Sequence, residues 1–310
     1  MAVSRKVQLG VQILLLVLSI VALIATIRDA FHEADNRVEV ETKYEQPPEG
    51  ALRVLFLGNS HLYKSNIPRQ VQEIAASTPG AKPIWCETFL YPGVTLAWHT
   101  KNGASIEALK QPWDVVVLQE QSLQALAEPK VWADSTRTIV RRARAGGTKR
   151  IVYLETWARH DDDRFLKKYP DVFGKDYADG QARLSEVIAA MAKRHEIEVA
   201  PVGTAWADVS KSHRLHADTS HANVPGSYLA ALAIHRTIQD APVTATTWAP
   251  GKVEESLAST IRVVVEGVFA KPEEEEPSGE DAEASSPDGS SEKSPDASAD
   301  AGDDDVAEDR

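Results

Sequence analysis

The chain has 310 residues, of which 43% are hydrophobic, and its formal net charge is −12 at pH 7. It holds one cysteine, which excludes an intramolecular disulfide. The negative charge comes from the carboxyl-terminal end, because residues 273–310 carry 16 acidic and 2 basic side chains and the rest of the chain is close to +2. A nearly neutral body beside an acidic segment lacks the basic surface that nucleic acids require, so we expect no nucleic-acid partner.

The amino-terminal segment has the length and composition of a membrane span. Residues 7–27 contain no charged side chain, and at ~1.5 Å per residue a helix of this length extends roughly 30 Å, the thickness of a bilayer core. Arg5 and Lys6 precede the apolar run, an arrangement that keeps the amino terminus cytoplasmic. We therefore expect residues 1–28 to be a transmembrane anchor that holds the remainder outside the cytoplasm. A signal segment that is cleaved, leaving a secreted protein, is the alternative.

Three regions of different composition follow the apolar segment. Residues 29–50 are charged and end in Pro-Pro-Glu-Gly, which is typical of a linker. Residues 51–270 are long enough to form one domain with its own core. Residues 271–310 contain almost no large apolar side chain, so they cannot bury enough surface to fold and are predicted to be a disordered acidic tail.

Strand and helix patterns alternate along residues 51–270. Short apolar runs rich in β-branched side chains predict strands at 52–57, 83–90, 114–118, 150–154 and 198–202. Helical spacing predicts helices at 67–77, 105–109, 130–145, 176–195, 225–239 and 252–269, with a long polar loop at 157–175. Such alternation indicates an α/β fold, with a parallel sheet covered by helices on both faces.

Polar residues follow three of the predicted strands at the point where each strand ends. Ser60 follows the first strand, residues 119–122 follow the third, and residues 155–157 follow the fourth. In a parallel sheet these ends share one edge, where ligands bind. We therefore expect the three groups to meet there. His61 directly follows Ser60, and we expect its ring to face solvent on the turn; lining of the pocket is the alternative.

A late Asp-x-x-His sequence supplies what a serine nucleophile needs. A serine hydroxyl attacks an ester only when a base takes its proton, and histidine titrates near neutral pH. His221 is the predicted base, and Asp218, three residues earlier, is close enough to orient its ring. The oxyanion that forms needs donors placed in advance. The backbone N–H groups of Ser60 and Gly93 and the side-chain amide of Gln121 are the predicted donors.

In this order and spacing, the motifs resemble the SGNH, or GDSL-type, hydrolase superfamily. The resemblance is carried by residues 54–60 (Val-Leu-Phe-Leu-Gly-Asn-Ser), 113–122 (Trp-Asp-Val-Val-Val-Leu-Gln-Glu-Gln-Ser), 156–159 (Thr-Trp-Ala-Arg), and 215–221 followed by 225–229. It implies a flavodoxin-like three-layer α/β/α sandwich with a five-stranded parallel sheet. It also implies that Ser60 is the nucleophile, His221 the base and Asp218 the carboxylate that orients it.

The resemblance also implies roles for residues of the second and third blocks. Gly93 takes the place of the second-block glycine of the oxyanion hole. Gln121 stands where the family has asparagine, and it keeps the amide donor on a side chain that is one methylene longer; Gln119 is the alternative donor. For substrate contacts we single out Gln119, Trp157 and Arg159, because an aromatic ring can stack on a sugar and a guanidinium can hold an anion. Core packing and surface ion pairs are the alternative reading of Trp157 and Arg159.

No metal site and no cofactor are expected, since the run His160 to Asp163 lacks the glycine-spaced pattern of a calcium loop. The predicted function is an exported, membrane-tethered serine esterase. Its substrates would be carboxylic esters on an acylated small molecule or polysaccharide, and the resemblance favours O-acetyl groups on carbohydrate or envelope polymers. Two alternatives remain, a lipase or thioesterase acting on longer acyl chains, and a non-catalytic glycan-binding domain that keeps the fold.

Overall fold

The computed structural model describes residues 36–270. The predicted anchor or signal segment (1–28), the first part of the predicted linker and the predicted acidic tail lie outside the described residues. Within residues 36–270, no helix is both long and apolar enough to cross a bilayer.

Five parallel strands form one sheet, which confirms the predicted fold. The strands are β1 (Leu52–Gly58), β2 (Ile84–Leu90), β3 (Val115–Leu118), β4 (Arg150–Leu154) and β5 (Glu198–Ala200). Their order is β2-β1-β3-β4-β5, and every neighbouring pair is parallel. The strand after which Ser60 lies is therefore flanked on both sides, by β2 and by β3. This order is that of flavodoxin-like folds.

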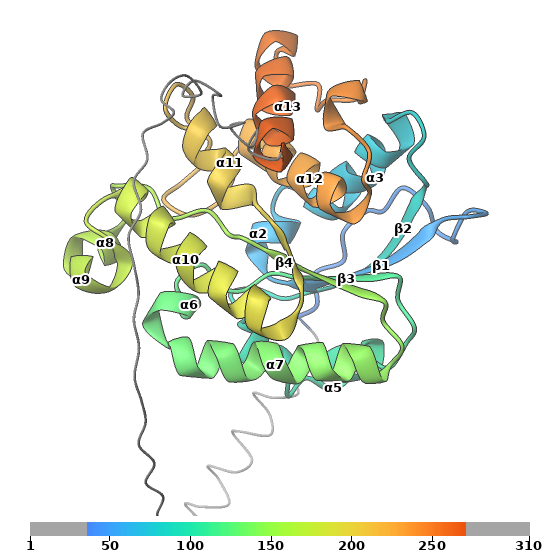
Figure 1. The fold of residues 1–310 in the computed structure, drawn as a ribbon, viewed down its shortest axis with the longest axis horizontal. Helices are drawn as coiled ribbons and strands as arrows, with labels where there is room; N and C mark the ends of the chain where they lie inside the picture. Colours follow the sequence, from blue (N-terminus) through green and yellow to red (C-terminus); the bar gives the residue numbers. More distant parts are fainter. Residues whose placement is uncertain (1–35, 271–310) are drawn as a thin grey trace, which may run out of the picture. The chain divides into compact units, whose positions relative to one another are not determined.

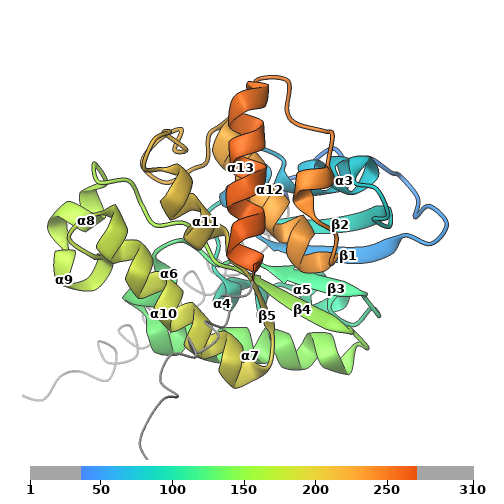
Figure 2. The same ribbon diagram turned by 45° about the horizontal axis from the view of Figure 1, so that its top comes forward.

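Alternate side chains of the strands enter two hydrophobic cores, one on each face of the sheet. Val54 and Phe56 of β1 pack with helices α3 (Ile67–Ser77), α11 (Val202–Val209), α12 (Val224–Ile238) and α13 (Glu255–Phe269). Leu55 and Leu57 pack with α4 (Leu96–His99), α5 (Gly103–Ala108), α7 (Pro129–Ala145) and α10 (Tyr177–His195). Figures 1 and 2 show the resulting three layers, with α3, α12 and α13 over one face and α5 and α7 over the other. Burial on both faces explains why the strands read as continuous apolar runs.

The remaining helices are short and lie in the connections. They are α2 (Ser60–Tyr63), α6 (Gln124–Ala127), α8 (Arg164–Lys168), α9 (Pro170–Phe173) and the 3₁₀ turn η1 (Val243–Ala245). The helices α8 and α9 lie within residues 157–175, where the sequence predicted a polar loop. The Asp163 side chain accepts a hydrogen bond from the Phe165 N–H and so begins α8, and Pro170 lies in the first turn of α9. The last strand also ends earlier than predicted, because Pro201 has no N–H for the sheet and α11 begins directly after it.

Residues 36–46, which we call the N-terminal strap, lie alongside β2 and α3. The Val38 N–H donates to the carbonyl of Leu90 at 2.8 Å, and the Arg37 guanidinium lies 4.0 Å from the centre of the Phe89 ring. Further along the strap, Lys43 forms an ion pair of 2.6 Å with Glu73 of α3. The strap therefore starts beside the last residue of β2 and runs toward the amino-terminal end of β1.

Candidate active site

A short turn at the end of β1 exposes the Ser60 hydroxyl. Asn59 has an extended backbone and begins α2, where its side-chain oxygen accepts a hydrogen bond from the His61 N–H at 3.1 Å. The Asn59 amide group donates to the carbonyl of Val94 at 2.9 Å. Asn59 is 1% exposed. The side chain next to Ser60 therefore links this turn to the loop after β2 and fixes the position of the serine.

Ser60, His221 and Asp218 form a continuous hydrogen-bonded series. The distance from Ser60 Oγ to His221 Nε2 is 2.9 Å, and the distance from His221 Nδ1 to Asp218 Oδ2 is 2.7 Å. With Nδ1 protonated and bonded to the carboxylate, Nε2 carries the lone pair that can accept the serine proton. The three side chains come from the ends of the domain sequence, and the structure brings them together at the carboxyl edge of the sheet.

The segment that carries Asp218 and His221 closes on itself. The backbones of His216 and Ala222 form an antiparallel bridge, and the Ala217 N–H donates to the carbonyl of His221 at 2.8 Å. Partial burial opposes ionisation of Asp218, but hydrogen bonds from the backbone N–H groups of His221 and Ser220 outweigh it. They hold the pKa of Asp218 well below its ordinary value. The carboxylate is therefore ionised wherever the histidine works as a base.

Three predicted oxyanion donors are unoccupied within the described part of the chain. The backbone N–H of Ser60, the backbone N–H of Gly93 and the side-chain NH₂ of Gln121 make no hydrogen bond to residues 36–270. Gly93 follows β2 and Gln121 follows β3, the two strands on either side of β1. Gly93 has a φ of +66°, a conformation that side-chain-bearing residues rarely adopt. The Gly93 and Gln121 donors therefore lie on loops that follow the two strands beside β1, and all three donors remain free for a ligand.

Gln119 lies beneath the turn instead of facing a ligand. It is 1% exposed, its oxygen accepts the Asn59 N–H at 2.9 Å, and its amide group is bonded to the carbonyl of Glu120. A methyl group placed on Gly58 would come within 2.6 Å of the Gln119 oxygen. Both functions predicted for Gln119, substrate contact and alternative oxyanion donor, are inconsistent with this placement, because its polar atoms already hold the turn.

Trp157 and Arg159 also differ from the predicted substrate contacts. Trp157 is 1% exposed, stacks on Trp206 with 4.4 Å between ring centres, and donates to the carbonyl of Ser220 at 2.8 Å. Arg159 donates to the Ser122 hydroxyl at 3.1–3.2 Å and pairs with Asp163 at 3.0 Å. These positions fit the alternative reading of packing and ion pairing, in which both residues support the loops around the serine.

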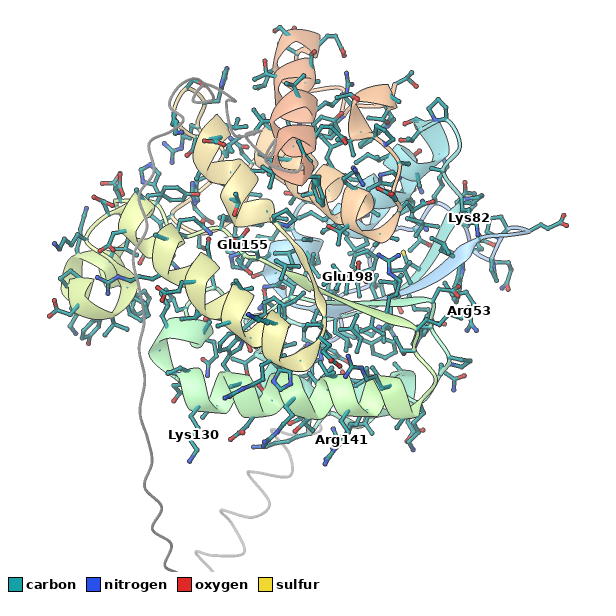
Figure 3. All side chains as sticks on the ribbon, viewed as in Figure 1. Arg53, Lys82, Lys130, Arg141, Glu155 and Glu198 are labelled. Carbon is teal, nitrogen blue, oxygen red and sulfur yellow. The ribbon has the colours of Figure 1, made fainter. Side chains whose placement is uncertain are left out.

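Glu155, the first residue after β4, is hydrogen-bonded to two helices. It accepts a hydrogen bond from Thr204 of α11 at 2.9 Å and is bonded to Ser185 of α10. Figure 3 shows it between these two helices. Residues 155–157, which were expected to join the site at the carboxyl edge, therefore contribute mainly to loop structure.

Two further residues lie beside His221, and of these Lys64 was not predicted. Lys64 Nζ lies 3.2 Å from His221 Nδ1 and 3.9 Å from Asp218 Oδ2. The spacing of four residues between Ser60 and Lys64 could have predicted that Lys64 lies near the serine, because residues four apart share a helix face. His61, expected to face solvent, is 6% exposed, and its ring centre lies 5.1 Å from that of His221. Burial is the main cause that lowers the pKa of His61 to about 3, and the neighbouring His221 and Arg159 side chains add to it, so the His61 ring is neutral at pH 7.

Within residues 36–270, no cluster of three or more His, Cys, Asp or Glu side chains is arranged to hold a metal ion.

Comparison with known proteins gives structural matches only. No protein-family model and no curated protein matches the sequence. A candidate SGNH hydrolase from Slackia heliotrinireducens is 28% identical, with a TM-score of 0.53 over 61% of this chain and 100% of that chain. A DUF4886 family protein from Bacteroides uniformis is 16% identical, with a TM-score of 0.59 over 71% of this chain and 95% of that chain. The chain therefore has an α/β fold with a five-stranded parallel sheet like that of SGNH hydrolases.

Proposed function

We propose that residues 51–270 form a serine esterase of the SGNH type. The observation that carries the proposal is the series Ser60 Oγ to His221 Nε2 to Asp218, with distances of 2.9 and 2.7 Å. Free N–H donors on the loops after β2 and β3 flank this series. A nucleophile, a base, an orienting carboxylate and an oxyanion site are the parts that ester hydrolysis requires.

The reaction proceeds through an acyl-serine intermediate. His221 Nε2 takes the Ser60 proton while Oγ attacks the ester carbonyl carbon, and the N–H groups of Ser60 and Gly93 with the Gln121 amide stabilise the oxyanion. The protonated ring then gives its proton to the alkoxide oxygen, and the alcohol leaves. A water molecule, deprotonated by His221, attacks the acyl group, and the carboxylic acid is released with the serine restored.

We propose further that the enzyme is tethered to the outer surface of a membrane through residues 1–28. The N-terminal strap supports this reading, because Val38 is bonded to Leu90 at the carboxyl end of β2. The chain thus enters the domain at the edge where Ser60 lies. Residues 29–35 extend at most about 25 Å, so a tether would keep Ser60 close to the membrane. Acylated polymers of the cell envelope, O-acetylated carbohydrates in particular, are the substrate class that fits this position.

Hydrolysis of p-nitrophenyl acetate by the purified chain tests the esterase. Ser60→Ala should reduce kcat/KM by about 10³-fold or more, whereas Ser256→Ala, on the exposed face of α13, should leave it unchanged. Equal rates for Ser60→Ala and the unaltered chain would refute the assignment of the nucleophile. A series of esters from acetyl to decanoyl separates the acetylesterase from a lipase or thioesterase, since only the latter would gain activity with chain length.

Membrane extraction tests the tether separately. The exported chain should remain with membranes after washing in high salt and should be released by detergent, with residues 1–28 still present by intact mass. Recovery of a shortened soluble chain would show that the segment is a cleaved signal instead.

A further inference from the structure

A hollow of about 380 Å³ lies next to the segment that carries Asp218 and His221. Residues 210–216, together with His160, Asp161 and Tyr177, line it. This volume is in the range of pockets that bind small ligands. Neither Ser60 nor His221 is among its lining residues, so the hollow is distinct from the site described above.

The lining offers many hydrogen-bond donors and a single carboxylate. Lys211 and Arg214 are the two basic side chains of the lining, and the hydroxyl groups of Ser210 and Ser212 and the rings of three histidines add polar atoms. Among the described residues, Asp161 is the only carboxylate that lines the hollow, and it accepts a hydrogen bond from the Tyr177 N–H at 2.6 Å. Such a set suits a ligand that is rich in oxygen and negatively charged.

The cations keep free donors for such a ligand. The Arg214 Nε donates to the carbonyl of His216 at 3.0 Å, and its terminal nitrogens make no hydrogen bond to residues 36–270. Lys211 pairs with Asp208 at 2.7 Å, but both side chains are more than half exposed, so this pair is weak and can open.

The hollow shares its backbone with the base and its carboxylate. His216 lines it and is bridged to Ala222, and the His160 N–H donates to the carbonyl of Thr219 at 3.0 Å. His216 Nε2 is 3.0 Å from the carbonyl of Ala158, to which it donates, which leaves Nδ1 as an acceptor. A ligand seated here therefore touches the same loop, 216–222, that presents His221 to Ser60.

We propose that this hollow is a binding subsite for an anionic sugar unit, one that bears a carboxylate or a phosphate, in the polymer that presents its ester to Ser60. The inference rests on the proposed esterase function and deepens it by naming acidic polysaccharides as the substrate class. Arg214 and Lys211 hold the anion, and the hydroxyl and imidazole groups contact the sugar oxygens.

Binding to the full chain carrying Ser60→Ala tests the subsite without turnover. The probes are trigalacturonate, glucose 1-phosphate and the neutral control maltotriose, each measured by calorimetry. Adding Lys211→Gln and Arg214→Gln together should weaken binding of the anionic probe by about tenfold or more, since two charge-assisted contacts are lost. The matched control is Lys130→Gln with Arg141→Gln, two cations on α7 in the opposite layer (Figure 3), which should change binding less than twofold.

The outcome among the probes identifies the anion. Binding of trigalacturonate alone assigns a carboxylate, and binding of glucose 1-phosphate alone assigns a phosphate. Equal binding of maltotriose, or unchanged binding in the Lys211 and Arg214 variant, would overturn the subsite.

Kinetics with Ser60 intact separate this inference from the esterase itself. In the Lys211 and Arg214 variant, KM for acetylated pectin should rise, while kcat/KM for p-nitrophenyl acetate stays unchanged. If both activities fell alike, the two cations would act on the catalytic loop and not on a substrate. If the unaltered chain hydrolysed neither ester yet bound trigalacturonate, the esterase would be refuted and the anion site would stand alone.

Discussion

At the scale of single residues, the negative charge of Asp218 orients the ring of His221. Its Oδ2 lies 2.7 Å from His221 Nδ1, and its Oδ1 accepts the backbone N–H groups of Ser220 and His221, each at 2.7 Å. The carboxylate thus fixes both the ring tautomer and the loop that carries it. Half of the Asp218 side chain is exposed, so its contribution is to orientation far more than to stability.

Asp218→Asn should therefore impair activity without unfolding the domain. We expect kcat to fall by about 10³- to 10⁴-fold, because an amide no longer favours the tautomer in which Nε2 accepts the serine proton. The melting temperature should change little. Asp134→Asn, at an exposed ion pair on α7, is the control and should retain full activity. Retention of more than a tenth of the activity in Asp218→Asn would mean that another group orients His221.

The position of Ser60 also depends on the absence of a side chain at Gly58. An added methyl group would meet the Gln119 oxygen at 2.6 Å and Leu62 at 2.9 Å. Gly58→Ala should displace the turn and reduce kcat/KM by about 10²-fold, since small misplacements of a nucleophile are costly. Gly267→Ala, where nothing lies within 4 Å, should keep full activity and gain slightly in stability, because alanine favours helix. Equal activity in the two variants would contradict this role.

At the scale of elements, a buried carboxyl joins the end of β3 to the start of α4. Glu120 is 2% exposed and accepts the backbone N–H groups of Gln121 at 2.6 Å and Leu96 at 3.1 Å. Burial raises the pKa of Glu120 to about 8, although these two N–H groups favour the charged form. The folded domain therefore keeps a proton on Glu120 that the unfolded chain loses near the ordinary pKa of 4.5.

This proton makes stability fall as pH rises from about 4.5 to about 8, since the folded state binds the extra proton throughout that window. Glu120→Gln keeps one acceptor oxygen and cannot ionise. Its melting temperature should exceed that of the unaltered chain by about 3 °C or more at pH 8.5, and the difference should shrink toward pH 5. Glu107→Gln, at an exposed pair on α5, should show no such trend. A difference that is constant between pH 5 and 8.5 would contradict the raised pKa.

The sequence was sufficient to predict the sheet but not every boundary. The central strands β1, β3 and β4 are short runs rich in apolar residues, so their pattern indicated a parallel sheet buried on both faces. The helix α11 was missed because its apolar side chains continue the run of β5, and only Pro201 marks the change. The helices α8 and α9 are four or five residues long, too short to show a helical period.

The sequence predicted the catalytic residues of the candidate site but not all of its substrate contacts. Ser60, Asp218 and His221 were found from residue type and order, and the structure places them within hydrogen-bonding distance. Sequence alone does not distinguish a residue at the carboxyl edge that faces solvent from one that faces the core. Gln119 and Trp157 were therefore assigned to substrate although both are 1% exposed.

At the scale of the whole molecule, the N-terminal strap connects the predicted tether to the edge that carries Ser60. Lys43 pairs with Glu73, its N–H donates to Gln72 at 2.7 Å, and Arg69 donates to the carbonyl of Thr42 at 2.7 Å. These contacts are part-buried, so they should stabilise the domain. The strap also lies along β2, an edge strand whose free backbone groups favour aggregation when exposed.

Deleting residues 1–46 should therefore lower the melting temperature by about 5 °C or more and increase aggregation. Deleting residues 1–35 is the matched control, because it leaves every described contact of the strap in place. Differential scanning calorimetry of both shortened chains and light scattering at equal concentration would provide the comparison. The same melting temperature for the two deletions would show that the strap does not stabilise the fold.

The central claim is that Ser60 is a nucleophile activated by His221. It is tested most directly by treating the chain with a fluorophosphonate and measuring the intact mass and the site of the adduct. We predict one adduct per chain, located on Ser60 by peptide mapping, and none in Ser60→Ala or after heat unfolding. Absence of an adduct on the folded chain, or an adduct on another serine that persists in Ser60→Ala, would contradict the account.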